Sequence, residues 1–137
     1  MKRTLFIVAI TAILTTACSE SLEDRAAREA KEYTEKFCPT PVQQFERTDS
    51  ITFDKPTKTY TFYRTLCGDA DNEEVIREQR KVLDKAIKDG IRNNTSLKVY
   101  KTAKFNFRLV YHSESNPKKV LLEYLLTPKD YLSKDVK

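Results

Sequence analysis

The stretch that decides the fold is residues 105–127, FNFRLVYHSESNPKKVLLEYLLT. Apolar side chains fall at every second position over its first eight residues, and alternation returns from residue 120 onward, which is typical of β-strands. The polar segment between them contains Asn116-Pro117, a pair that favours a connecting loop. The sequence therefore predicts two strands, Phe105–His112 and Val120–Thr127, and Pro128 ends the second.

A second pair of strands is predicted upstream. Residues 47–54 alternate through Ile51 and Phe53, and residues 58–66 resume the extended pattern. The segment Asp-Lys-Pro-Thr at 54–57, where the first run ends, has the composition of a turn. The pattern indicates a β-hairpin.

Helical periodicity occurs in three segments. After Ser21, which is placed to form a capping box with Asp24, apolar residues recur on one face as far as Phe37, and prolines stop this helix at Cys38. Residues 71–93 begin with capping and acidic side chains and keep a helical apolar spacing. Residues 97–103 fit a strand or a short helix, and capping side chains just before them favour the helix.

The order α-β-β-α-(α)-β-β predicts an α+β fold. We expect a four-stranded, mostly antiparallel sheet with two, or three, helices on one face. The chain divides into a removed signal peptide at 1–17, a lipidated N-terminus and short tether at 18–23, one domain at 24–132 and a C-terminal tail at 133–137. About 120 residues suit a single packed core and are too few for two domains.

The N-terminal segment predicts export and lipid attachment at Cys18. Lys2 and Arg3 precede an apolar run of about ten residues, whereas a stable bilayer span needs about 20. Cys18 and the small residues before it resemble the lipobox of bacterial lipoproteins, with Thr15 standing where Leu is usual. The alternative is an ordinary secretory signal cleaved near Ala17, which would leave Cys18 as a free thiol.

Acylation of Cys18 would tether the mature protein to a bacterial membrane through palmitate-type chains, and two or three chains suffice for stable anchoring. Ser19 follows the cysteine in place of the Asp that resembles an inner-membrane retention signal. We therefore expect the outer membrane, on its periplasmic face or at the cell surface. The acidic residues Glu20, Glu23 and Asp24 fit a surface-sorting signal, but they also fit the start of a helix.

The charge balance argues against a nucleic-acid partner. The full chain has 25 basic and 20 acidic side chains, and loss of Lys2 and Arg3 leaves 23 against 20, a net charge of +3. Phosphate-driven binding of nucleic acid usually requires a dense basic patch. The sequence predicts a membrane and a protein as the partners of this chain.

Cys38 and Cys67 predict a disulfide bond, because they remain as an even pair in an oxidising compartment once Cys18 carries lipid. Closing a loop of about 30 residues would stabilise the fold by about 3–4 kcal/mol. Strict alternation, however, points Cys67 away from Tyr60 and its face. Either the strand bends at Gly68, which we expect, or the covered face is the one that carries Tyr63.

No pattern in the chain predicts catalysis. His112 is the only histidine and lies beside Ser113 and Glu114, but neighbours on a strand point to opposite faces. One histidine and no spaced cysteine cluster argue against zinc, and two glycines argue against a glycine-rich phosphate loop. We predict no catalytic residue, no metal ligand, no cofactor and no enzyme activity.

Five segments resemble an uncharacterised family of small exported bacterial proteins, many of them lipoproteins. The resemblance implies an α-β-β-α-β-β pattern and adds no activity. It departs from the family at Ser115-Asn116-Pro117, where an Asp-Gly-like turn is usual, so a wider last hairpin is expected. The segments are Pro41-Val42, RTDSI at 47–51, YTFYRTL at 60–66, FNFRLVY at 105–111 and TPKDY at 127–131.

Three function classes remain. The first is a non-catalytic envelope lipoprotein that binds a protein partner through a sheet face exposing Tyr63, Arg64 or Arg108, since Tyr and Arg often anchor interfaces. The second is an immunity or inhibitor protein that acts against an envelope-directed toxin or hydrolase. The third, a small-ligand carrier or an enzyme, requires a concave pocket that the sequence does not announce.

Overall fold

The structure, a computed structural model, describes residues 19–132. The predicted signal peptide, Cys18 and the predicted tail at 133–137 lie outside the described residues. The α+β class and the predicted order of elements are confirmed. With η marking short 3₁₀ helices, the elements are α1 (Leu22–Phe37), β1 (Glu46–Asp54), β2 (Thr59–Leu66), η1 (Gly68–Ala70), α2 (Glu73–Glu78), α3 (Arg80–Asn93), η2 (Thr95–Leu97), α4 (Lys98–Thr102), β3 (Asn106–Ser113), β4 (Val120–Leu126) and α5 (Pro128–Leu132).

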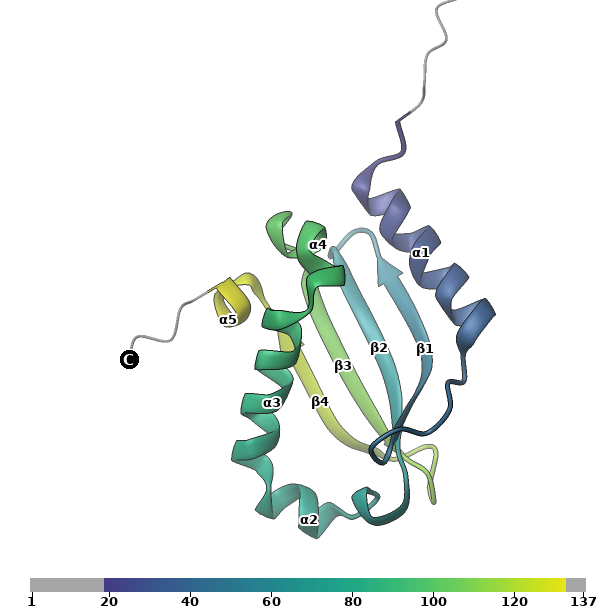
Figure 1. The fold of residues 1–137 in the computed structure, drawn as a ribbon, viewed down its shortest axis with the longest axis vertical. Helices are drawn as coiled ribbons and strands as arrows, with labels where there is room; N and C mark the ends of the chain where they lie inside the picture. The colour runs from purple at the N-terminus through teal and green to yellow at the C-terminus, as the bar shows by residue number, and fades with distance from the viewer. Residues whose placement is uncertain (1–18, 133–137) are drawn as a thin grey trace, which may run out of the picture.

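The four strands form one sheet in the order β1-β2-β3-β4. β1 pairs with β2 and β3 pairs with β4 in antiparallel fashion, while β2 and β3 run parallel. A parallel pair requires a long crossover, and the segment from η1 to α4 provides it. The helices lie over one face of the sheet, as predicted, with α1 beside β1 and α3 on the β4 side (Figure 1).

Helix α1 begins where the sequence predicts. The Ser21 hydroxyl accepts a hydrogen bond from the Asp24 backbone N–H at 3.0 Å and caps the helix. Of the predicted apolar face, Ala26 and Ala30 are buried against the sheet. The last turn projects beyond the core, because Tyr33 and Phe37 are exposed and pack on each other with ring centroids 5.1 Å apart.

The predicted helix over 71–93 is two helices. Asn72 caps α2, and the helix breaks at Gln79, whose φ of −90° and ψ of 8° leave the α region before α3 begins. Residues 95–102 are helical, as we expected, in η2 and α4. The short helix α5 was not predicted, since Pro128 indicates only the end of the strand.

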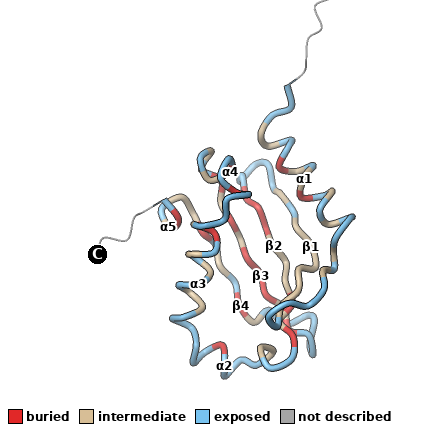
Figure 2. The backbone as a smooth tube through the Cα atoms, viewed as in Figure 1, coloured by how far each residue is buried: buried red, intermediate tan, exposed pale blue. Residues whose placement is uncertain are grey.

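The core fills the space between the helices and the covered face of β2 and β3, where the buried backbone concentrates (Figure 2). Phe105 and Phe107 are the largest fully buried side chains. The Tyr60 hydroxyl donates to the Ala26 carbonyl at 2.9 Å and fixes α1 to the sheet. The covered face is therefore the one that carries Tyr60, and Tyr63 points to the open face.

The predicted Cys38–Cys67 disulfide is not formed, and both residues are free thiols. Cys67 continues the line of β2, because its N–H donates to the carbonyl of Phe45, the residue just before β1. Cys38 lies at the outer edge of β1, beside Thr34, whose hydroxyl bonds the Ile51 backbone. With β1 between them, the two cysteines are separated by about two strand spacings, or roughly 10 Å. A disulfide requires Cα atoms within about 7 Å.

Candidate functional site: a groove beneath helix α3

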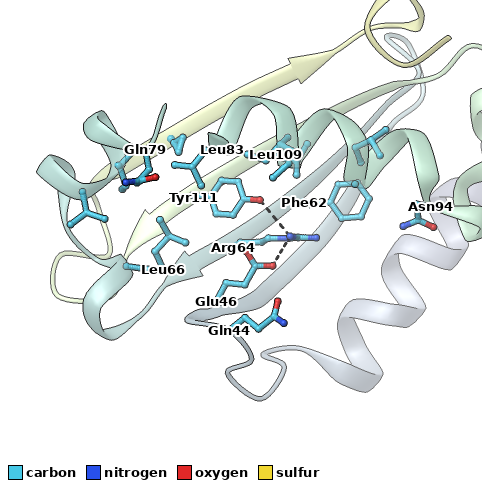
Figure 3. Close-up of a pocket in the computed structure, with 18 of the residues that line it drawn as sticks. Gln44, Glu46, Phe62, Arg64, Leu66, Gln79, Leu83, Asn94, Leu109 and Tyr111 are labelled. Atoms are coloured by element: carbon cyan, nitrogen blue, oxygen red, sulfur yellow. Dashed lines mark hydrogen bonds and ion pairs between the residues drawn. The ribbon is translucent and has the colours of Figure 1, made fainter. Parts of the chain in front are cut away.

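A groove of about 600 Å³ lies between α3 and the sheet. β2, β3 and β4 form its floor, α2 and α3 form one wall, and Gln44 and Glu46 form the opposite rim (Figure 3). Most of its surface is apolar, and polar side chains stand mainly at the rims. The apolar side chains include Phe62, Leu66, Ile76, Leu83, Ile87, Ile91, Leu97, Leu109 and Leu122.

The groove exists because α3 carries small residues toward it. Ala86 and Gly90 are four residues apart and therefore lie on the same side of the helix. A Cβ built on Gly90 would meet no atom within 4 Å. The space directly beside Gly90 is consequently open.

Arg64 places a charge on the otherwise apolar floor. One of its terminal nitrogens, Nη1, donates to Glu46 Oε1 at 2.7 Å and to the Tyr111 hydroxyl at 3.4 Å (Figure 3). The guanidinium also lies 5.9 Å and 5.8 Å from the ring centroids of Phe62 and Tyr111. Its Nε is buried and has no hydrogen-bond partner. A buried donor without a partner is costly, and the Arg64 side chain as a whole is still 26% exposed.

A strained turn forms the rim at Gln44 and Phe45. Their φ angles are 50° and 64°, and hydrogen bonds in both directions between Gln43 and Glu46 close the two-residue turn. Turns of this kind favour Asn and Gly, because other residues are strained at positive φ. Phe45 packs beside Gly68, yet its side chain is 55% exposed. The chain thus holds a large aromatic side chain in solvent at the end of the groove.

Polar contacts hold α3 above β4. The Tyr124 hydroxyl donates to Asp84 Oδ1 at 2.5 Å, and Arg80 Nε donates to the same oxygen at 3.0 Å. The guanidinium of Arg80 lies 4.8 Å from the Tyr124 ring centroid. The Tyr124 hydrogen bond, together with Arg80, lowers the pKa of Asp84. The wall of the groove is therefore attached to the sheet through an ionised Asp84.

The structure does not place Tyr63, Arg64 and Arg108, the residues of the predicted sheet-face site, on one surface. Arg64 lines the groove on the covered face, whereas Tyr63 and Arg108 lie on the open face. There Tyr63 approaches His112, with ring centroids 6.5 Å apart, and Arg108 Nη2 lies 2.6 Å from Glu123 Oε1. Only Arg64 of the three contributes to the groove.

His112 and its neighbours form no catalytic arrangement in the described chain. His112 Nδ1 lies 3.0 Å from the Pro117 carbonyl, and the Ser113 hydroxyl contacts the Ser115 hydroxyl at 3.0 Å. Glu114 accepts instead from the Gly68 N–H. Within residues 19–132, no three His, Cys, Asp or Glu side chains gather in a way that could hold a metal ion.

The groove residues Gln44, Ala86 and Gly90, and the exposed Phe45 next to the rim, were missed by the sequence analysis. Ala86 and Gly90 carry a usable signal, since two small residues four apart beside a helical apolar stripe indicate an unfilled face. The turn at Gln44-Phe45 carries none, because neither residue type is typical of a tight turn.

The membrane anchor is a separate question. Cys18 lies outside the described residues, so its acylation stays a prediction. Over residues 19–132, none of the helices combines the length and the apolar character needed to cross a membrane.

Three solved structures share this fold. A Pseudomonas aeruginosa protein thought to be secreted is 9% identical with a TM-score of 0.61, covering 82% of this chain and 98% of that one. The pilotin EpsS of the Vibrio vulnificus type 2 secretion system is 9% identical with a TM-score of 0.58, covering 82% and 93%. The type II secretion pilotin AspS of Vibrio cholerae is 14% identical with a TM-score of 0.54, covering 79% and 90%.

Sequence comparison identifies the family. No curated protein sequence matches the chain. Residues 21–122 match the model of a domain of unknown function, DUF8479, and this range runs from the cap of α1 into β4. Because the match includes the helices and strands that build the groove, the chain belongs to the DUF8479 family.

Proposed function

We propose that this protein is a non-catalytic lipoprotein of the bacterial envelope that binds a segment of a protein partner in the groove beneath α3. The observation that carries the proposal is that the apolar lining continues onto exposed surface. Val75 of α2, which lines the groove, is 42% exposed, and Phe45, which directly follows the lining residue Gln44, is 55% exposed. A protein partner can cover the groove and this exposed rim together.

The groove favours an amphipathic helix as the bound segment. Helix α3 has 14 residues and is about 21 Å long, which suits a partner helix of similar length. The apolar face of that helix would lie on the floor of the groove. A side-chain oxygen on the same face would accept a hydrogen bond from the guanidinium of Arg64, whose side chain is 26% exposed.

Anchoring and location belong to the same proposal. Acylation at Cys18 would hold the domain at the outer membrane, with its partner in the envelope. Two of the similar structures are pilotins of type II secretion systems, which supports an envelope role within a protein assembly.

A second candidate is a carrier of a small apolar ligand. The groove volume of about 600 Å³ falls within the range of ligand pockets, which is about 300–1,000 Å³. If the protein is such a carrier, native mass spectrometry of the purified protein should detect a non-covalently bound small molecule. If it binds a protein partner, a protein should co-purify with it at a defined stoichiometry instead.

The proposal is tested by filling the groove. Gly90→Trp places an indole in the open space beside α3, and Lys88→Trp places the same group on the exposed outer side of the helix. The tagged full chain is purified from mild-detergent extracts of its own bacterium, and the amount of partner protein that co-purifies is measured. We expect Gly90→Trp to lower that amount at least tenfold. Lys88→Trp should leave recovery unchanged, with both variants melting near the wild type. Equal recovery with the two variants would contradict the proposal, and recovery of a toxin or hydrolase would identify an inhibitor.

A further inference from the structure

One end of the molecule brings together the start of α1, the β1–β2 turn and the η2–α4 segment (Figure 1). Lys55 in the turn pairs with Asp24, and Lys58 Nζ lies 3.1 Å from Glu23 Oε1. Leu22 lines a shallow pocket together with residues of η2 and α4. We call this surface, formed by Leu22, residues 55–58 and residues 95–104, the tether end.

The unpaired charges of the tether end are positive. The acidic residues next to it in α1, Glu23 and Asp24, are paired with lysines of the turn, and Glu20 is paired with Arg28 at 2.8 Å. Within the described residues, Lys98 and Lys104 have no ion-pair partner, and both are exposed. Beside them Val99 is 41% exposed. Exposed lysines around an apolar side chain can bind a membrane of anionic phospholipids, with the lysines at the headgroups and the apolar side chain toward the acyl chains.

The tether end also has little freedom to leave the membrane. Only Ser19, Glu20 and Ser21 separate Cys18 from helix α1. Even fully extended, the steps from Cys18 to Leu22 span at most about 14 Å. A lipid on Cys18 would therefore hold Leu22 within about two Debye lengths of the headgroups at physiological ionic strength.

We infer that the tether end docks on the anionic phospholipid headgroups of the membrane that holds Cys18, with Lys98 and Lys104 against the phosphates and Val99 toward the acyl region. The inference rests on the proposed acylation of Cys18. It orients the whole molecule, because α2 lies at the opposite end of the fold (Figure 1). Docking would leave the exposed groove end at Phe45 and Val75 facing away from the membrane and open to a partner.

Fluorescence quenching in vesicles tests this orientation. The mature lipidated chain carries a fluorescent amino acid at Ser96 in the tether end or, as a matched position, at the exposed Glu78 in α2. The vesicles contain phosphatidylcholine with or without phosphatidylglycerol, and a nitroxide on the lipid headgroups acts as the quencher. We expect quenching at Ser96 but not at Glu78, and stronger quenching at Ser96 when phosphatidylglycerol is present.

Charge reversal identifies the contact. The double variant Lys98→Glu, Lys104→Glu should shift the docking equilibrium toward the free domain by about tenfold or more. High salt should have the same effect because it screens exposed charges. Lys88→Glu, on the outer side of α3, should leave the quenching unchanged, and thermal unfolding confirms that each variant is folded.

Two results would overturn the inference in distinguishable ways. If quenching at Ser96 is the same with and without phosphatidylglycerol, and the same in the double variant, the domain does not dock on the headgroups and is held by its tether alone. A chain that does not float with the vesicles would refute the anchor itself. Neither result bears on whether Gly90→Trp blocks the groove.

Discussion

Phe45 occupies the second central position of a tight two-residue turn with a φ of 64°. A non-glycine residue in the left-handed region costs about 1–2 kcal/mol. Such strain persists where the surrounding structure imposes it, and it clusters at functional sites. At the end of the groove, an exposed aromatic ring has the character of an interface anchor.

Phe45→Gly separates folding from binding. Glycine adopts the positive φ without strain, so we expect the free energy of unfolding in urea to stay equal or to rise by up to about 1 kcal/mol. Recovery of the partner should fall at least tenfold, because the anchor is lost. Phe45→Tyr keeps the ring and should bind normally. A Gly variant that unfolds more easily yet keeps its partner would assign Phe45 to the fold.

Arg64 shows how far the sequence can specify a side chain's surroundings. Alternation on a strand separates Arg64 from Tyr63 and predicts which residues share a face. It does not reveal which face the helices cover, and that choice decides whether Arg64 is a surface charge or part of a groove. The pairing of Arg64 with Glu46, 18 residues earlier, depends on the β1–β2 register.

At the level of elements, α3 depends on Asp84 for its position over β4. The pKa of Asp84 is lowered from 3.8 in the folded protein, first by the Tyr124 hydrogen bond. A carboxyl group with a depressed folded pKa stabilises the fold above its unfolded pKa, which is about 3.9. That stabilisation is lost as the pH falls through the folded pKa.

Asp84→Asn should therefore have a pH-dependent effect. We expect the variant to be less stable than the wild type at neutral pH, and the difference to shrink below about pH 4, where the wild-type carboxyl takes up a proton. Urea unfolding at both pH values measures this. A difference that stays constant between neutral and acid pH would show that charge on Asp84 does not hold α3 in place.

Local sequence patterns predicted whether a segment is a helix or a strand, but they did not predict where a helix breaks. Strands β1 to β4 were predicted because alternation is a local property of the chain. No proline or glycine near Gln79 indicates the break there, so the continuous apolar stripe predicted one helix. Helix α5 is stabilised by tertiary contacts, including a hydrogen bond of 2.7 Å from the Tyr131 hydroxyl to the Phe105 carbonyl.

For the whole molecule, the features that were missed depend on how elements are placed. The groove is a space between α3 and the sheet, and no single element's periodicity encodes it. The Cys38–Cys67 bridge was predicted from compartment and parity, but β1 lies between the two thiols. The compartment and the number of cysteines do not reveal which strand separates two thiols.

The two proposed surfaces lie at opposite ends of the molecule and would orient it relative to the membrane. The tether end, with Lys98 and Lys104, lies at the end where α1 starts, and the exposed rim of the groove lies toward α2 (Figure 1). A lipoprotein arranged in this way would present its groove to a partner and keep its basic end on the membrane.

The most direct test of the partner-binding groove is photo-crosslinking from within it. A photoreactive amino acid replaces Ala86, which lines the groove, or Lys88, which lies on the outer side of the same helix, in the full chain in intact cells. We predict a single protein adduct from position 86, and the crosslinked segment of that protein should have apolar residues at helical spacing. The same adduct should be absent from position 88 and should be lost when Gly90→Trp is introduced. Adducts only to lipid, or the same proteins from both positions, would contradict this prediction.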